Sequence, residues 1–186
     1  MELLSPAQCV GYLAFFLGVG TFLQKSDRSL KVFNAGACLV YAVHFVMLGN
    51  LPASGSALVS SVRSFLALRT RAPWLAGTII AINLVVGVTF AKSGAGWLPV
   101  IASCSATIAI FYMQGIPMRL VLLGCTFLWL INNILSGSIG GTLLETVLAI
   151  VNTTTIFRMV RPLTPEPVAV AQYPSSSSRT FPAKFR

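Results

Sequence analysis

The chain has 186 residues, of which 55% are hydrophobic and only 9% are charged. This composition excludes an ordinary soluble domain, in which about a quarter of the residues are charged. The formal net charge of +9 would indicate nucleic-acid binding in a soluble protein. Here most basic residues lie between or after apolar segments, so we expect the lipid bilayer and its anionic headgroups as partners, and no nucleic acid.

Apolar segments of similar length follow one another along the chain. A membrane-spanning helix needs about 20 mostly apolar residues, with about 17 as the lower limit. Seven segments reach this length: residues 6–24, 30–49, 54–70, 74–92, 97–114, 117–135 and 141–160. The N-terminus lacks the basic region of a cleaved signal peptide, so we expect the first segment to be retained. The sequence therefore predicts an all-α membrane protein with seven transmembrane helices.

Basic residues indicate the orientation of these segments. They occupy alternate gaps and the C-terminal end: Lys25, Arg28, Lys31, Arg69, Arg71, Arg119, Arg158, Arg161, Arg179, Lys184 and Arg186. The second and sixth gaps, residues 50–53 and 136–140, carry no charge. Because Lys and Arg in short loops stay on the cytoplasmic side, we predict that the N-terminus lies outside and the C-terminus in the cytoplasm.

The third segment, residues 54–70, is the weakest, because it contains five Ser and, well inside it, Arg63. If it lay on the membrane surface, every later loop would change sides, and Arg119, Arg158 and Arg161 would lie outside with the tail. Seven spans therefore agree better with the charge distribution. Residues 162–186 are rich in Pro and Ser, and we predict a disordered basic cytoplasmic tail.

The first three segments align with the last three at a shift of 88 residues. This shift pairs Gly36 with Gly124, Tyr41 with Trp129, His44 with Asn132, and Gly49 with Gly137. We interpret the seven-helix domain, residues 1–161, as two three-helix repeats over about 6–70 and 97–161, joined by a linker helix over 74–92. Because a single linker helix separates them, the two repeats have the same orientation in the membrane. Parallel repeats occur in one class of small transporters, which place their substrate site between the repeats near the membrane midplane.

Two stretches resemble the YgjV family of bacterial inner membrane proteins. The first runs from residue 44 to residue 71 and contains Arg63, and the second is the Gly-Ser-Ile-Gly-Gly-Thr run that leads to Glu145. The resemblance covers residues 11–161 and excludes the tail. It implies a location in the bacterial inner membrane and names no substrate.

The layout of three, one and three helices is more distantly similar to the SWEET and PQ-loop group of seven-helix transporters. That group carries an aromatic residue in the second helix of each repeat and an Asn in the third. Tyr41, Trp129 and Asn152 stand at comparable positions, whereas Arg63 stands where the first repeat would carry its Asn. The chain also has no Pro-Gln pair. These departures argue against a sugar as substrate.

Arg63 and Glu145 are the only charges well inside the segments. A charge near the centre of a membrane helix costs at least about 2.5–3.5 kcal/mol, so each is expected to face a partner or water. We predict that Arg63 binds an anionic group or pairs with Glu145, and that Glu145 or His44 carries a coupling proton. The candidate substrate-binding or pathway residues are Tyr41, His44, Arg63, Trp129, Asn132, Asn133, Glu145 and Asn152.

Each candidate also has a purely structural interpretation. Arg63 can extend toward the cytoplasmic interface, and Glu145 can favour the positive end of its helix. His44 and the three Asn residues can hold helices together through hydrogen bonds. Tyr41 and Trp129 can serve only in packing.

Signatures of enzymes are absent from the sequence. A single His excludes metal sites built from several His residues, and no Gly-x-Ser-x-Gly or phosphate-binding Gly-Lys-Ser/Thr run occurs. We therefore expect no enzymatic activity, no cofactor and no metal. The favoured function is transport of a small polar or anionic solute, and the alternative is a non-transporting accessory or scaffold protein that binds a partner or lipid. A homo-oligomer is compatible with either.

Overall fold

The computed structural model describes residues 3–22, 24, 27–66, 68–70 and 72–160. Within these residues the chain forms seven α-helices, one short 3₁₀ turn and no strand. The elements are α1 (Pro6–Phe22), α2 (Asp27–Met47), α3 (Leu51–Leu66), α4 (Pro73–Phe90), η1 (Gly94–Gly96), α5 (Trp97–Tyr112), α6 (Gly115–Leu135) and α7 (Ile139–Val160). The tail predicted for residues 162–186 lies outside the described part of the chain.

Among the described residues, four helices are long and apolar enough to cross a membrane. They are Pro73–Phe90, Gly94–Tyr112, Gly115–Leu135 and Ile139–Val160. Two shorter apolar helices cover Pro6–Thr21 and Lys31–Met47. Large apolar side chains also stay exposed on the outside of the bundle, as Phe16, Val88 and Phe157 do, and such a surface suits lipid. These features confirm the predicted class, an all-α membrane protein.

Several helices begin earlier than the sequence predicts, because proline lies in their first turn. Pro52 is the second residue of α3, Pro73 is the first of α4, and Pro117 is the third of α6. The first N–H groups of a helix have no partner within the helix, so proline, which lacks this group, is tolerated there. The prolines therefore lie inside the helices and not in the turns before them.

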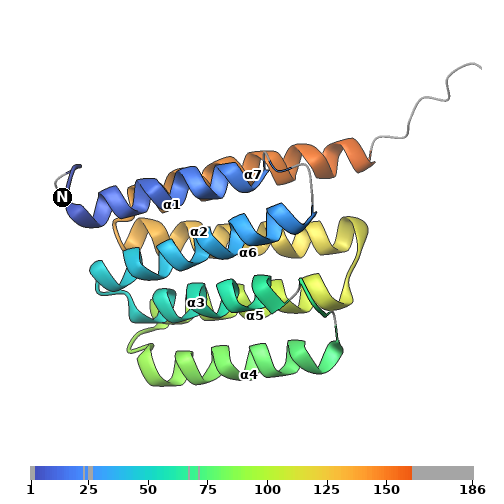
Figure 1. Cartoon of the computed structure of the whole chain (residues 1–186), viewed down its shortest axis with the longest axis horizontal. Coiled ribbons are helices and arrows are strands. Elements are labelled where there is room, and N and C mark those ends of the chain that lie inside the picture. The colour runs from blue at the N-terminus through green and yellow to red at the C-terminus, as the bar shows by residue number, and fades with distance from the viewer. Residues whose placement is uncertain (1–2, 23, 25–26, 67, 71, 161–186) are drawn as a thin grey trace, which may run out of the picture.

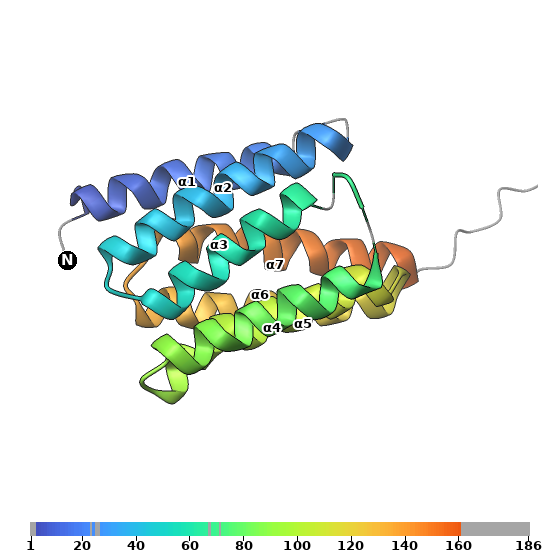
Figure 2. The same ribbon diagram turned by 60° about the horizontal axis from the view of Figure 1, so that its bottom comes forward.

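The helices form two layers of three, with α4 along one edge (Figure 1). α1, α2 and α3 form one layer and α5, α6 and α7 the other, and each helix packs against its neighbour in sequence. α1 packs against α7, and α3 packs against α5, so these six helices close into a ring. α4 packs outside the ring against α3 and α5 (Figure 2). α2 and α6 occupy the middle of the two layers and face each other.

The turn after α2 and the turn after α6 have the same backbone structure. Gly49 and Gly137 each have a positive φ, +73° and +67°, which glycine adopts without steric cost. Their N–H groups donate to the carbonyl three residues earlier, at 3.0 and 3.1 Å, respectively. The N–H groups of Asn50 and Ser138 donate to the carbonyl five residues earlier, at 2.9 Å in both turns. Both turns are therefore Schellman motifs.

The same two residues begin the next helix. The Asn50 side chain accepts the N–H of Ala53 at 3.1 Å, and the Ser138 hydroxyl accepts the N–H of Gly141 at 3.1 Å. Asn and Ser are among the residues preferred at this capping position. The α2–α3 and α6–α7 hairpins thus match residue for residue at the shift of 88 found in the sequence.

Candidate functional site

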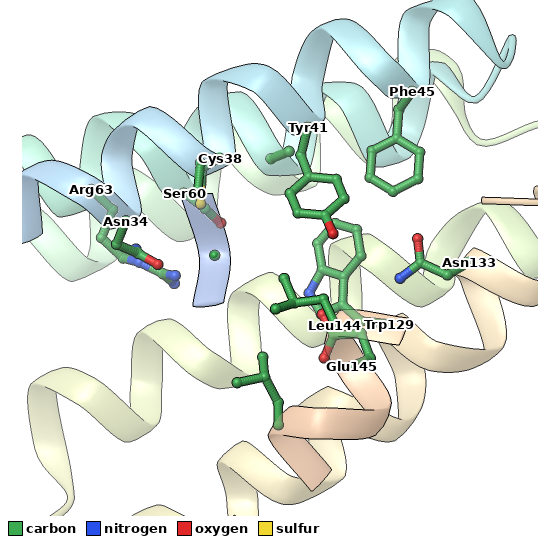
Figure 3. Close-up of a pocket in the computed structure, with 14 residues that line it drawn as sticks. Asn34, Cys38, Tyr41, Phe45, Ser60, Arg63, Trp129, Asn133, Leu144 and Glu145 are labelled. Carbon is green, nitrogen blue, oxygen red and sulfur yellow. The ribbon is translucent and has the colours of Figure 1, made fainter. Parts of the chain in front are cut away.

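A cavity of about 180 Å³ lies between the two layers (Figure 3). Its walls come from α2 and α6 in the middle of each layer, from α3 and α7, and from one glycine of α1. A protein cavity of about 150 Å³ can hold benzene, so this central cavity is large enough for a small molecule. Five of the eight predicted residues line it: Tyr41, Arg63, Trp129, Asn133 and Glu145.

Arg63 enters the cavity wall from α3 and is held from one side by α5. Its Nη1 donates to the hydroxyl of Thr107 at 2.8 Å and to the carbonyl of Ser103 at 3.3 Å. A guanidinium has five N–H donors, and the described residues give the others no hydrogen-bond partner. Arg63 is therefore anchored by one nitrogen, and its other donors remain available to a ligand.

A buried polar network supports this anchor. The Ser103 hydroxyl lies 3.3 Å from the Ser60 hydroxyl of α3 and accepts the amide of Asn83 of α4 at 3.0 Å. Thr107 donates to the Ser103 carbonyl one turn earlier in α5. The network links α3, α4 and α5, so the position of Arg63 depends on three helices.

Glu145 enters the cavity wall from α7. Within the described residues its carboxylate has neither a hydrogen-bond partner nor an ion-pair partner, so the predicted pair with Arg63 is not formed. An unpaired carboxylate is costly in an apolar bundle. Since Glu145 borders the cavity, water or a ligand can supply the missing partner.

An aromatic stack crosses the cavity between α2 and α6. The rings of Tyr41 and Phe45 stack with centroids 5.8 Å apart, and those of Phe45 and Trp129 stack at 5.9 Å. The Tyr41 hydroxyl is buried without a hydrogen-bond partner. Asn133 is 2% exposed, and its amide oxygen also lacks a partner. Tyr41 and Asn133 thus belong to the cavity wall and each contain a buried polar atom without a hydrogen-bond partner.

His44 lies outside the cavity, nearer the turns. It is fully buried, and its two ring nitrogens lie 2.7 Å from the Ala7 carbonyl and 2.7 Å from the Ser138 hydroxyl. The ring also packs on Gly11, where an added Cβ would lie 2.7 Å from it. Both nitrogens are thus engaged in contacts between helices, in line with the structural interpretation of this residue.

Asn132 takes the equivalent place on α6 and also lies outside the cavity. Its amide oxygen accepts the Asn50 side chain at 2.9 Å. The Asn50–Asn132 and Ser138–His44 bonds are reciprocal, because each joins the capping residue of one layer to the middle helix of the other. We call His44, Asn50, Asn132 and Ser138 the turn-end clamp. It closes the bundle beyond the cavity, on the side of the two matching turns.

Asn152 lies apart from both the cavity and the turn-end clamp. Its amide donates to the carbonyl of Arg119 at 3.0 Å and so joins α7 to the beginning of α6. This contact holds two neighbouring helices together and reaches no cavity-lining group.

Four important polar residues are not among the predicted ones: Asn50, Ser138, Ser103 and Thr107. The first two carried a signal, because both follow a glycine, belong to the residue types that cap helices, and align at the shift of 88. Ser103 and Thr107 are spaced by four residues in an apolar segment, which places them on one helical face. That spacing indicates a polar face but not its partner Arg63.

Comparison with known proteins identifies a family and a relative. The family described as a bacterial inner membrane protein, Imp-YgjV, matches residues 5–162. The inner membrane protein YgjV of Escherichia coli (strain K12) is 36% identical over 155 residues, which cover 83% of this chain and 85% of that protein. No solved structure matches the chain.

Proposed function

The chain belongs to the YgjV family of bacterial inner membrane proteins, and from this premise we propose that it transports a small polar or anionic solute. The observation that carries the proposal is the central cavity. It contains a cation, Arg63, that is only partly satisfied and an acid, Glu145, that has no partner in the described residues. Charges that are retained inside a membrane protein typically mark the pathway of a substrate or an ion.

We further propose that α1–α3 and α5–α7 are two parallel repeats, with α4 as the linker. The helix contacts support this arrangement. If α1 and α3 correspond to α5 and α7, the α1–α7 contact corresponds to the α5–α3 contact, and both contacts are present. The bounds of α2 and α6 differ by 88 residues at both ends, and the following turns share their hydrogen bonds. The cavity between these repeats then corresponds to the midplane site of parallel-repeat transporters.

This proposal requires that all seven helices cross the membrane, including α3. With 16 residues, α3 is about 24 Å long, which is short for a span of about 30 Å. Its polarity is turned inward, because Ser56, Ser60 and Ser64 are buried while Leu58 and Val62 are exposed. An inward polar face inside a ring of helices is compatible with a lipid-facing apolar side. With seven spans, the basic gaps predict that the two matching turns lie outside and the C-terminus in the cytoplasm.

Transport in such a protein would proceed by rocking of the two repeats about the cavity. On this proposal the turn-end clamp closes the cavity from the outside, and opening requires its two reciprocal hydrogen bonds to break. Because the clamp consists of uncharged side chains, its bonds are of modest strength, about 0.5–1.5 kcal/mol each. Such bonds can close a gate without preventing its opening.

The test is a screen of small solutes by thermal shift on the purified protein, followed by uptake of each hit into proteoliposomes. We expect a solute that stabilises the wild type, fails to stabilise Arg63→Ala, and accumulates only in liposomes that contain the wild type. Arg119→Ala is the matched control, because the Arg119 side chain does not line the cavity. Solutes that bind through Arg63 without uptake would contradict transport and favour the accessory protein.

A further inference from the structure

The two charges of the cavity wall have opposite sign and come from different repeats. Arg63 and Glu145 are the only Lys, Arg, Asp or Glu residues among the described residues that line it. Neither neutralises the other through an ion pair, so each needs a counter-charge or water. A ligand with one charge would leave the other wall charge without a counter-charge, whereas a ligand with both charges matches both. Charge balance in this cavity therefore favours a zwitterion.

Arg63 is suited to the anionic end of such a ligand. Its Nη1 is fixed by Thr107 and Ser103, which sets the plane of the guanidinium. The remaining donors form a rigid fork that matches the two oxygens of a carboxylate. Figure 3 shows Arg63 at one end of the cavity, away from Glu145.

The other part of the cavity is suited to an ammonium group. Glu145 supplies a carboxylate, and the aromatic residues Tyr41 and Trp129 line the same part of the wall (Figure 3). Ammonium groups are attracted both to carboxylates and to the faces of aromatic rings.

The volume limits the size of the ligand. A cavity of about 180 Å³ is slightly larger than one that holds benzene, so it accommodates about six to eight non-hydrogen atoms. We infer that the ligand of the central cavity is a small zwitterion with one carboxylate and one ammonium group, of the size of a small amino acid. This inference rests on the proposed function, since it names the solute class of the same site.

The test measures binding by calorimetry to the purified wild type with a matched set of compounds. The zwitterions are alanine, β-alanine, proline and glycine betaine; propionate lacks the ammonium group, ethylamine lacks the carboxylate, and glycerol lacks both. We expect at least one zwitterion to bind, and propionate and ethylamine to bind about tenfold more weakly or worse, because hydrogen bonds to charged groups are the strong ones.

Charge-removing variants give a second, reciprocal readout. Glu145→Gln should weaken binding of the zwitterion and leave binding of propionate unchanged. Arg63→Gln should weaken binding of the zwitterion and leave binding of ethylamine unchanged. A general loss of folding would weaken the binding of all compounds together. Arg119→Gln serves as the folded control for removal of a basic side chain. Thermal unfolding of each variant without ligand confirms that it is folded.

The outcomes separate the ligand class from transport. Equal binding of propionate and the zwitterions, preferred binding of glycerol, or no binding of any zwitterion at millimolar concentration would overturn the zwitterion class. Zwitterion binding without uptake into proteoliposomes would overturn transport and leave the ligand class standing. Uptake of a simple anion with no zwitterion binding would overturn the zwitterion class and leave transport standing.

Discussion

Arg63 is held in place by α5, although it belongs to α3. Its one anchored nitrogen uses the Thr107 hydroxyl and the Ser103 carbonyl. This arrangement stabilises a cation inside an apolar bundle and still leaves donors for the cavity. It also explains why Arg63 does not need Glu145 as a partner.

Removal of the Thr107 hydroxyl should therefore destabilise the protein. In Thr107→Val the shape is nearly kept but Arg63 loses its shortest hydrogen bond, and we expect a loss of about 1–3 kcal/mol in the free energy of unfolding. Denaturant titration in detergent measures this loss. Thr89→Val is the control, because Thr89 also donates to a carbonyl four residues earlier but is exposed and contacts no cation. An equal effect of the two substitutions would show that Thr107 does not anchor Arg63.

Position along a helix was easier to predict for individual residues than the partner of each side chain. Five of the eight predicted residues line the cavity. Tyr41, Trp129 and Glu145 lie more than one turn inside their helices, whereas Arg63 and Asn133 lie in the last turns of α3 and α6. His44 and Asn132 lie one turn or less from the helix end and instead contact the capping residues of the opposite layer. Those partners are more than 80 residues away in the chain, so local spacing contains no information about them.

At the scale of elements, apolar length predicted the helices, and turn chemistry set their true ends. The segments predicted for α3 and α4 began after Pro52 and Pro73, and the segment predicted for α6 began at Pro117, whereas each helix begins earlier and includes its proline. The glycines that end α2 and α6 are the more informative signal. Their positive φ allows both Schellman turns, which in turn place the capping residues Asn50 and Ser138 toward the opposite layer.

Substitution of Gly49 tests this role of the turn. An added Cβ at Gly49 meets no neighbouring atom, so any loss in Gly49→Ala comes from its positive φ alone. We expect a loss of about 1–2 kcal/mol in the free energy of unfolding. Gly36→Ala is the control, because Gly36 lies inside α2 and an added Cβ meets no neighbouring atom there. Inside a helix, Ala is favoured over Gly by up to about 1 kcal/mol. If both variants were equally stable, the turn would tolerate another conformation.

At the scale of the whole molecule, the matching of the two layers is structural and not chemical. The hairpins share their turns, but each cavity charge occurs in one layer only. At the shift of 88, Glu145 corresponds to Ala57, which also lines the cavity. A symmetric scaffold therefore surrounds a polarised cavity, which suits a ligand with two different ends.

In the proposed transport cycle, alternating access depends on the turn-end clamp. Asn50 and Asn132 come from opposite layers, and their side chains lie within hydrogen-bond distance. In a variant without the four native cysteines, Asn50→Cys with Asn132→Cys should form a disulfide on oxidation and fix the two layers at this end. Each single Cys variant serves as a control for oxidation itself.

Uptake of the cavity ligand into proteoliposomes by this double variant, before and after oxidation, tests the central claim most directly. We predict that oxidation abolishes uptake by the double variant and that reduction restores it. Oxidation should not change the uptake measured for either single variant. Uptake that continued at the same rate with the cross-link formed would contradict rocking of the two layers about the central cavity.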